Sequence, residues 1–392
     1  MATRAIPQQA PRPHAATELG HFLRHVDYLL LAAVGALIAY GLWVLEAVTR
    51  NDVAGDPGFY VFRQQIYVAV GVVVLAVMTA IHPEIWRRYA RFLYGLAIVF
   101  LLIVFPLAES VRGSQRWITF GSFNFQPSEI GKLLLILFLA AFVADRAKRI
   151  GEWRLLWAFV GLAAVPIVLV FKEPDFGSAL IYGCAAAAVL FFAGLPWKQL
   201  GTLFAGVAVL ALSALWFLPA AGLPVLDDYQ MDRLVGFVNP DVDPSGTTYN
   251  VNESITAVGS GGYDGRGVAG ATQTNLDFLP EHNTDFIFSS LAEQRGFVGA
   301  AILLLLYALV AWRGIKIIAV APTLFTAAAA GAIVFALLVQ VFVNIGMTIG
   351  IAPVTGIPLP LISYGGSSMI TTLAMIGVLE SIHVRGKLAG RR

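Results

Sequence analysis

Charged side chains are scarce in this sequence: they make up 13% of the 392 residues, whereas 58% of the residues are hydrophobic. Soluble domains carry about 25% charged residues. A globular core of this size could not hide so much apolar surface from water, so the composition excludes an ordinary soluble protein. Lipid must be the solvent for most of the chain.

Cysteine is almost absent, since Cys184 is the only one and lies inside an apolar run. A single cysteine excludes an intrachain disulfide and gives no support to a cysteine-based zinc site. The net charge of +2 is also small, so the charge balance does not indicate a nucleic-acid partner.

Long apolar runs are what the sequence has instead. A bilayer core about 30 Å thick needs roughly 20 apolar residues in a helix. Ten segments approach this length, at residues 28–48, 64–82, 89–108, 129–145, 155–172, 176–194, 199–219, 286–312, 319–349 and 363–384. We therefore expect an all-α polytopic membrane protein with about ten transmembrane helices. Residues 27–384 would form one membrane domain, between a disordered polar tail at 1–26 and a basic tail at 385–392.

Lysine and arginine predict the orientation, because they collect in loops on the cytoplasmic side of a membrane. With ten spans and the N-terminus inside, 17 of the 26 basic residues fall in cytoplasmic segments and seven in outer ones. The cytoplasmic set includes Arg87, Arg88 and Arg91 and a second cluster at 146–154. The distribution predicts that both termini are cytoplasmic.

One long extramembrane segment, residues 220–285, is expected on the outer side. It holds 10 of the 24 acidic residues. Long loops in compact membrane proteins usually carry function, so we expect the chemistry to be extracytoplasmic.

Titratable groups gather where this loop meets the eighth span, at Glu281, His282, Thr284 and Asp285. Partial desolvation at the lipid–water boundary would raise the pKa of Asp285 and make it a better proton acceptor. A simpler interpretation is that Asp285 or Thr284 caps the N-terminus of the span. The local sequence favours capping, and the two roles do not exclude each other.

A second polar group, Glu129 and Lys132, opens the fourth span after the helix-start residues Pro127 and Ser128. Three residues apart, the two side chains share one helix face. Ionisable groups in a span are costly and usually face a polar interior. They form either a structural ion pair or a site where Lys132 binds an anionic head group or tunes a nearby carboxylate.

A third group, Glu173 and Asp175, flanks Pro174 between the fifth and sixth spans. A tight interhelical turn explains these residues slightly better than a ligand site. The alternative is that the two carboxylates hold a divalent cation such as Mg²⁺, which prefers oxygen ligands.

The fourth stretch, residues 353–368, contains three prolines and three glycines and cannot form a continuous helix. Irregular backbone at membrane depth must be buried in protein or line a wet cavity. We expect a broken or re-entrant element before the last helix. The hydroxyls and N–H groups of this stretch could bind phosphate or sugar, at Ser363, Gly365, Gly366, Ser367 and Ser368. Close packing of the glycines is the competing explanation.

Taken together, these motifs resemble the shape, elongation, division and sporulation (SEDS) family, whose best-known members are RodA and FtsW. The resemblance covers about residues 27–384 and rests on Gly113-Ser114-Gln115-Arg116-Trp117-Ile118, Phe125-Gln126-Pro127-Ser128-Glu129-Ile130-Gly131-Lys132, Glu173-Pro174-Asp175-Phe176-Gly177, Gly259-Ser260-Gly261-Gly262, Phe278-Leu279-Pro280-Glu281-His282 with Thr284-Asp285-Phe286, and Pro358-Leu359-Pro360 with Ser363-Tyr364-Gly365-Gly366-Ser367-Ser368. Asn344-Ile345-Gly346-Met347 looks more like RodA than FtsW.

The resemblance implies a peptidoglycan glycosyltransferase that polymerises lipid II into glycan strands for cell elongation and shape. The family's essential loop aspartate corresponds to Asp285, and its fourth-span glutamate and lysine correspond to Glu129 and Lys132. Direct displacement would invert the anomeric carbon. Arg116, Lys132 or a cation would stabilise the leaving diphosphate. The resemblance further implies that a set of polar residues and glycines supports the substrate or the leaving group: Asp175, Glu281, His282, Thr284, Ser363, Gly365, Gly366, Ser367 and Ser368.

The resemblance also implies no organic cofactor, with a divalent cation (Mg²⁺ or Mn²⁺) at Asp175, Glu173 or Asp285 as an option. Lipid II would be the substrate, a class B penicillin-binding protein the partner, and the bacterial cytoplasmic membrane the location. Two rivals remain: a transporter or flippase of a lipid-linked precursor, since transporters also have broken helices and buried charges, and a non-catalytic scaffold.

Overall fold

A computed structural model describes residues 24–107, 116–121, 123–213 and 248–389, together with three single residues between 213 and 248. Most of the predicted tail at 1–26 and the first part of the predicted loop at 220–285 lie outside these residues. The same holds for Gly113, Ser114 and Gln115 of the first motif and for residues 390–392.

Helices account for nearly all of the described chain. The long ones are α2 (Tyr28–Val48), α3 (Phe59–Ala80), α5 (Ala90–Leu107), α6 (Pro127–Ala144), α7 (Trp153–Lys172), α8 (Phe176–Phe192), α9 (Trp197–Leu212), α12 (Tyr249–Gly261), α15 (Ile287–Ala319), α16 (Leu324–Thr348) and α17 (Gly366–Ala389). The short ones are α4 (Pro83–Arg88), η1 (Ala147–Arg149), α13 (Gly267–Gly270) and α14 (Thr272–Asn275). An antiparallel hairpin pairs β1 (Ile118–Phe120) with β2 (Phe123–Phe125), in the register Ile118 with Phe125.

The membrane-spanning architecture predicted from the sequence is confirmed. Among the described residues, eight helices are long and apolar enough to cross a bilayer: α2, α3, α5, α6, α7, α15, α16 and α17. The two shorter apolar helices, α8 and α9, occupy the sixth and seventh predicted segments. The chain is therefore a multi-pass helical membrane protein.

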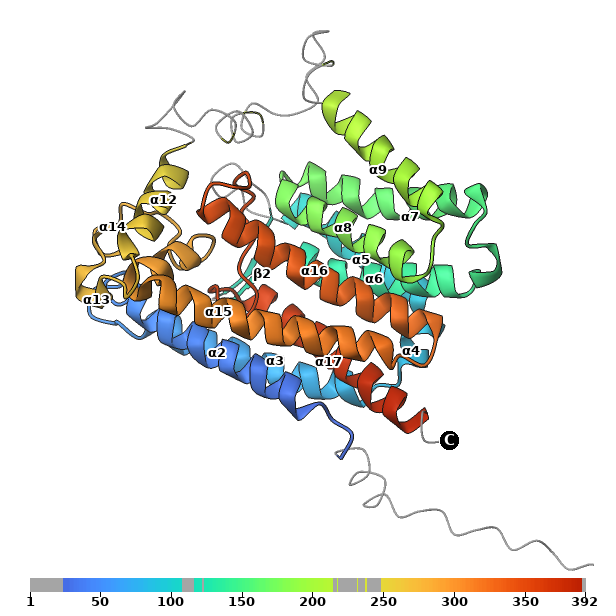
Figure 1. Ribbon diagram of the computed structural model, residues 1–392, viewed down its shortest axis with the longest axis horizontal. Coiled ribbons are helices and arrows are strands. Elements are labelled where there is room, and N and C mark those ends of the chain that lie inside the picture. The colour runs from blue at the N-terminus through green and yellow to red at the C-terminus, as the bar shows by residue number, and fades with distance from the viewer. Residues whose placement is uncertain are drawn as a thin grey trace, which may run out of the picture.

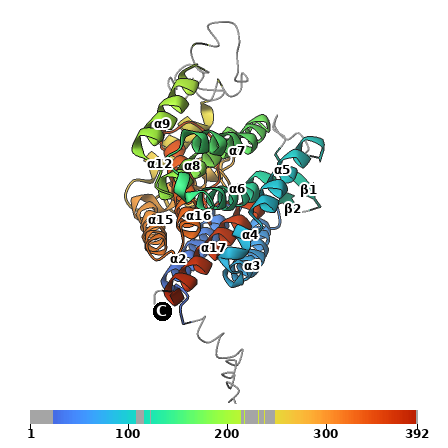
Figure 2. The same ribbon diagram turned by 90° about the vertical axis from the view of Figure 1, so that its right-hand side faces the viewer.

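Three helices form the centre of the bundle (Figure 2). The apolar windows of α6, α16 and α17 are 78%, 72% and 94% buried, against 11% for α3. A helix that is apolar all round must have protein or lipid on every side. The inner helices are surrounded by protein, and the outer ones place large apolar side chains such as Phe62, Phe92 and Leu210 on the surface, where lipid replaces water as the solvent.

The bundle has two distinct ends (Figure 1). The helices α12, α13 and α14 gather at one end, beside the start of α15, and we call this the loop end. Helix α4 and the C-terminal part of α17 lie at the opposite end (Figure 1).

Gly296 divides α15 into two helical parts, with φ 63° and ψ −161°. The amides freed by this break donate to another segment: Phe297 N–H bonds to the Gly262 carbonyl at 2.9 Å and Val298 N–H to the Tyr263 carbonyl at 3.2 Å. A side chain on Gly265 or Gly296 would collide with the backbone of the facing segment. The glycine-rich motif at 259–262 and its continuation therefore serve close backbone packing against α15.

Residues 349–365 contain no helix, as the prolines and glycines predict. Its second half is mostly buried, from Thr355 to Ser363, with Ile357, Leu359 and Leu361 almost inaccessible. Irregular backbone at membrane depth is thus enclosed by protein. We call residues 349–365 the re-entrant segment.

Candidate functional site

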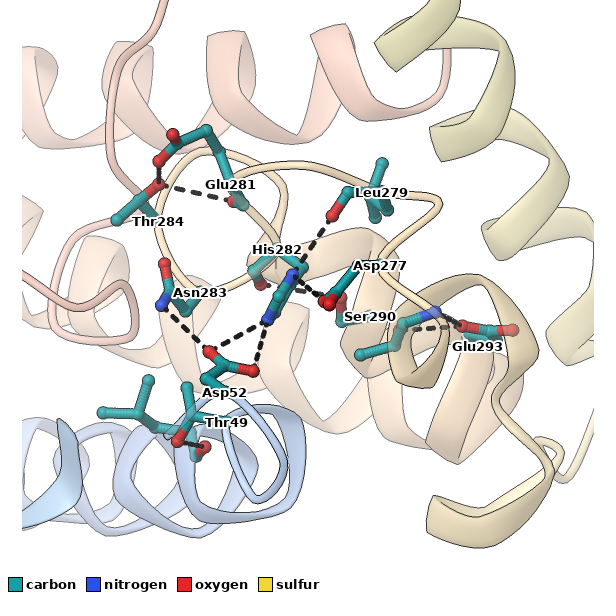
Figure 3. A network of polar contacts seen from close by, with 12 residues as sticks. Thr49, Asp52, Asp277, Leu279, Glu281, His282, Asn283, Thr284, Ser290 and Glu293 are labelled. Carbon is teal, nitrogen blue, oxygen red and sulfur yellow. Dashed lines mark hydrogen bonds and ion pairs between the residues drawn. The ribbon is translucent and has the colours of Figure 1, made fainter. Parts of the chain in front are cut away.

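His282 is held between two acceptors at the loop end (Figure 3). Its Nε2 lies 3.1 Å from an Asp52 carboxylate oxygen, and its Nδ1 lies 3.1 Å from the Leu279 carbonyl oxygen. Asn283 Nδ2 also donates to Asp52, at 3.5 Å. Asp52 lies in the turn between α2 and α3, so this turn fixes the orientation of the imidazole.

The surroundings of His282 favour its charged form. Burial lowers the pKa of His282, but the hydrogen bond and negative charge of Asp52, the Leu279 carbonyl and Asp277 together raise it above the ordinary value. An imidazole with an acceptor on each nitrogen satisfies both only when it is doubly protonated. His282 therefore supplies a positive charge beside the predicted catalytic loop.

The predicted loop residues contact the re-entrant segment directly. Ser363 Oγ donates to the Thr284 carbonyl at 2.6 Å, and Tyr364 N–H donates to the Asn283 carbonyl at 2.9 Å. Thr284 Oγ1 donates in turn to the Glu281 carboxylate at 3.0 Å. The first and fourth groups of sequence candidates thus form one structure, in which Ser363 positions the loop.

Asp285 is half-buried, and its backbone is fixed from α16. Asn344 Nδ2 donates to the Asp285 carbonyl at 2.8 Å and to the Ile357 carbonyl at 2.8 Å. The expectation that Asp285 or Thr284 caps the next span is wrong, because α15 begins at Ile287, its N-cap is Phe286 and no side chain caps it. The aspartate side chain is not needed for that structural role.

The re-entrant segment is also tied to α3, and the first turn of α17 after it is tied to the residue before α6. Gln64 of α3 donates to the Ser363 carbonyl at 3.1 Å and accepts from Gly365 N–H at 3.1 Å. Ser367 Oγ accepts from Gln126 N–H at 2.9 Å. Both serine hydroxyls are engaged by protein, which indicates that Ser363 and Ser367 position backbone rather than meet a ligand first.

Asp175 joins α6, α8 and the segment before β1. It caps α8 by accepting from Ser178 N–H at 3.0 Å, and it accepts from Gln126 Nε2 at 3.1 Å. Arg116 lies 3.8 Å from the Asp175 carboxylate and also donates to the Pro174 carbonyl. The interpretation of 173–175 as an interhelical turn is therefore confirmed, and Asp175 has little coordination capacity left.

Glu173 is different, because it is 1% exposed and neither of its carboxylate oxygens has a hydrogen-bond partner in the described chain. Burial, followed by the charge of Asp175, raises the pKa of Glu173 to about 8, which Arg116 lowers only in part. A buried carboxyl group without partners is unusual. It is mostly protonated at neutral pH unless a cation joins it.

Glu129 and Lys132 form the ion pair that their spacing predicts. Lys132 Nζ lies 3.2 Å from Glu129 Oε2, and both side chains are almost fully buried. Nearby, Tyr182 of α8 donates to the Ser128 carbonyl at 2.6 Å. The pair is enclosed within the bundle, so each charge depends on the other.

The contacts above place six of the sequence candidates in two groups. One group holds His282, Thr284 and Ser363, and the other holds Ser367, Asp175 and Arg116. The short stretch from Ser363 to Ser367 connects the two groups along the chain. Gly366 packs against Phe123 and Tyr67, which leaves no room for a side chain. Ser368 is 8% exposed, and the hydrogen bonds of the described chain give it no role.

Two places could hold a divalent cation. The orphaned oxygens of Glu173 are one, beside Asp175. The other was not predicted: ligand atoms of Asp52, Asp277 and His282 lie within 4.8 Å of one another. Two carboxylates and an imidazole suit Mn²⁺ or Zn²⁺ better than Mg²⁺, whereas Glu173 offers oxygen alone.

Sequence reasoning missed four side chains that organise the site: Asp52, Gln64, Glu293 and Asn344. Buried Glu293 of α15 accepts from Gln273 N–H, Thr274 N–H and Thr274 Oγ1 at 2.8–3.0 Å and so anchors α14. A lone polar residue inside an apolar span was the available signal for Asn344. Gln64 and Glu293 instead lie in short polar runs, Arg63-Gln64-Gln65 and Glu293-Gln294-Arg295, near the ends of their spans. No local signal marks Asp52, since its partner is 230 residues away.

The comparisons with known proteins agree with this architecture. Residues 25–388 match the family described as Cell cycle protein, which comprises FtsW, RodA and SpoVE. The chain is 38% identical over 367 residues to the peptidoglycan glycosyltransferase MrdB of Escherichia coli, covering 94% of this chain and 96% of MrdB.

Two solved structures have the same fold. One, described as showing structural coordination of polymerization and crosslinking by a peptidoglycan synthase complex, matches with a TM-score of 0.78 and 30% identity over 92% of this chain and 98% of that one. The rod shape determining protein RodA of Thermus thermophilus matches with a TM-score of 0.66 and 28% identity over 91% and 96%. The chain belongs to the Cell cycle protein family of FtsW, RodA and SpoVE.

Proposed function

We propose that this protein is a peptidoglycan glycosyltransferase that polymerises lipid II, a disaccharide-pentapeptide on undecaprenyl diphosphate. The family and the likeness to MrdB support the class of enzyme. The observation that carries the site assignment is the fixing of Asp285 from two sides. Asn344 bonds to its carbonyl, and the re-entrant segment bonds to the two residues before it.

In the proposed reaction, a sugar hydroxyl of the acceptor attacks the anomeric carbon of the donor. The new C–O bond forms as the bond to the diphosphate oxygen breaks, and the hydroxyl proton passes to the Asp285 carboxylate. One direct displacement inverts the anomeric carbon. A positioned general base typically contributes about 10²–10⁴-fold to the rate. The half-buried position of Asp285 and its freedom from capping α15 suit this role.

The leaving diphosphate needs positive charge, and the chain offers His282, Arg116 and Lys132. His282 is held by Asp52, Arg116 by Asp175 and Lys132 by Glu129. Because each cation already has a carboxylate partner, each would share its charge with the substrate rather than give up its partner. Preorganised charges of this kind act mainly by stabilising charge that develops in the transition state.

A divalent cation, Mg²⁺ or Mn²⁺, would fit at Glu173, where two buried oxygens lack donors. When bound, it would supply further charge for the diphosphate. Glu173 would then exchange its proton for the metal ion, and Asp175 would remain the cap of α8.

The proposed setting is the outer face of the bacterial cytoplasmic membrane, with both termini in the cytoplasm. The distribution of lysine and arginine supports this orientation. A class B penicillin-binding protein is the proposed partner, because glycan strands must also be crosslinked. The likeness to a chain described as part of a peptidoglycan synthase complex supports such an assembly.

Purified full-length protein in lipid nanodiscs, given fluorescent lipid II, tests the proposal. Wild type should produce glycan ladders on gels, whereas Asp285→Ala should fold and bind lipid II but produce none. Asp264→Ala removes an exposed carboxylate from the same segment and should leave ladders unchanged. Movement of lipid II across a bilayer without ladders would instead identify a flippase, and neither activity would identify a scaffold.

A further inference from the structure

A basic hollow lies among α4, α5, α6 and α7. Figure 1 shows α4 at the end of the bundle opposite the loop end. It has a volume of about 670 Å³. Its charged lining consists of Arg87, Arg88, Arg91, Arg146, Glu84 and Asp145. Its nearest lining residue on α6, Phe138, lies six positions after Lys132, which corresponds to about 9 Å along the helix.

The charges in this hollow do not balance. Arg87 is neutralised, since its Nη2 lies 2.9 Å from Asp145 and its Nη1 lies 3.6 Å from Glu84. Arg146 donates to the Phe142 carbonyl at 3.1 Å and stacks 4.1 Å over the Phe142 ring, neither of which carries a negative charge. Within the described chain, no carboxylate lies within 4.0 Å of Arg88, Arg91 or Arg146. Three guanidinium groups therefore lack an anion.

The remaining wall is largely apolar. Tyr94 of α5 stacks on Phe138 of α6 with ring centroids 4.3 Å apart, and its hydroxyl donates to the Leu162 carbonyl of α7 at 2.9 Å. Helices α5 and α7 also carry exposed aromatic side chains: Phe92 of α5 is 66% exposed and Trp157 of α7 is 60% exposed. The hollow thus combines uncompensated positive charge with surfaces that contact lipid chains.

We propose that this hollow binds the phosphate head group of one anionic phospholipid, such as phosphatidylglycerol or cardiolipin, with its acyl chains along α5 and α7. Arginine fits phosphate through paired N–H donors. Basic pockets between transmembrane helices are suited to such head groups, and each nearby arginine strengthens binding severalfold. The proposal goes beyond the glycosyltransferase function and does not rest on it.

Lipid binding to purified full-length protein tests the assignment. The protein in neutral detergent is titrated with phosphatidylglycerol or phosphatidylcholine, and bound lipids are counted by native mass spectrometry. The variant Arg88→Gln/Arg91→Gln/Arg146→Gln removes the three arginine charges that have no carboxylate partner in the described chain. The matched control Lys148→Gln/Arg149→Gln/Arg154→Gln removes the same charge from neighbouring positions that do not line the hollow.

Wild type should retain phosphatidylglycerol over phosphatidylcholine, the hollow variant should lose about 10-fold or more in retention, and the control should match wild type. Equal losses in both triple variants would overturn the proposal by showing general surface attraction. Displacement of the lipid by soluble glycerol phosphate at equal concentration would also overturn it, in favour of a free-phosphate site. If the hollow variant fails to fold, Arg91→Gln compared with Lys148→Gln makes the same test.

Discussion

Asn344 connects the backbone of Asp285 to the re-entrant segment, since its side-chain amide donates to the Asp285 and Ile357 carbonyls at 2.8 Å each. Asn344 is fully buried in α16. One amide thus sets the distance between the proposed proton acceptor and the segment that packs beside it. The Ile357 carbonyl is buried, so it would lose its hydrogen-bond partner if the amide were removed.

Replacing Asn344 by leucine should therefore reduce polymerisation without removing a reacting group. We expect kcat to fall roughly 10–100-fold, as the loss of two buried hydrogen bonds of about 1–1.5 kcal/mol each suggests, while KM changes little. Rates with fluorescent lipid II provide the measurement. Gln340→Leu, one helical turn away, is the control, and an equal loss in both variants would contradict a positioning role.

The Glu129–Lys132 pair allows its structural and functional roles to be separated. Lys132→Met leaves the buried Glu129 carboxylate unpaired and should destabilise the protein by about 3–5 kcal/mol. The double variant Glu129→Gln/Lys132→Met removes both charges and should recover most of that loss. Thermal unfolding in a fixed detergent measures both effects.

Polymerisation by the same double variant then decides the role of Lys132. If Lys132 assists the leaving diphosphate, the double variant is stable but makes no ladders. Full activity in the stable double variant would show that Glu129 and Lys132 form a structural ion pair and that Lys132 does not assist the reaction.

Asp52 should control the protonation of His282. Asp52→Asn removes the charge and acceptor that raise the pKa of His282, so that pKa should fall. A folded-state pKa above the unfolded value contributes stability below about pH 6.5, and this contribution is lost as the pH rises through the folded pKa. The stability difference between wild type and Asp52→Asn should therefore shrink as the pH rises.

Unfolding temperatures between pH 6 and 9, roughly the range over which histidine loses its proton, measure this effect. Asp56→Asn in the same turn serves as the control, because among the described residues the Asp56 carboxylate accepts a hydrogen bond only from Gly58 N–H. A pH-independent difference would show that Asp52 acts on His282 without changing its charge.

Metal binding should depend on Glu173 rather than on the Asp52, Asp277 and His282 group. Glu173→Gln should abolish saturable Mn²⁺ binding measured by electron paramagnetic resonance, and Asp277→Asn should leave it intact. Because the pKa of Glu173 is raised to about 8, protons should compete with the metal and binding should weaken as the pH falls below that value. Loss of binding in Asp277→Asn alone would assign the ion to the other group.

Hydrophobicity predicted the spans well, because each span must by itself be long and apolar enough to cross the bilayer. The first predicted segment, 28–48, coincides with α2, and the ninth, 319–349, contains α16. The break at 349–365 was also predictable, since proline and glycine act locally. The break of α15 at Gly296 was not, because it depends on the backbone of residues 261–265 packing against it.

The sequence predicted most residues of the site but not the hydrogen bonds that join residues far apart in the chain. The ion pair of Glu129 and Lys132 follows from helix spacing, which a sequence displays. The contacts of Asp52 with His282 and of Gln64 with Ser363 join residues 230 and 299 positions apart. The capping prediction for Asp285 failed for a related reason: Asn344 and Ser363 hold this turn from outside the helix that it precedes.

The backbone contact around Gly296 limits how this protein can be recombined with its relatives. Two glycine segments, 261–265 and 296, meet with no side chain between them, and the amides of Phe297 and Val298 depend on carbonyls across the contact. A chimera that imports the extramembrane segment alone would shift one partner against the other. Grafts should fold only when they carry both segments in unchanged register, so the two stretches must be exchanged together.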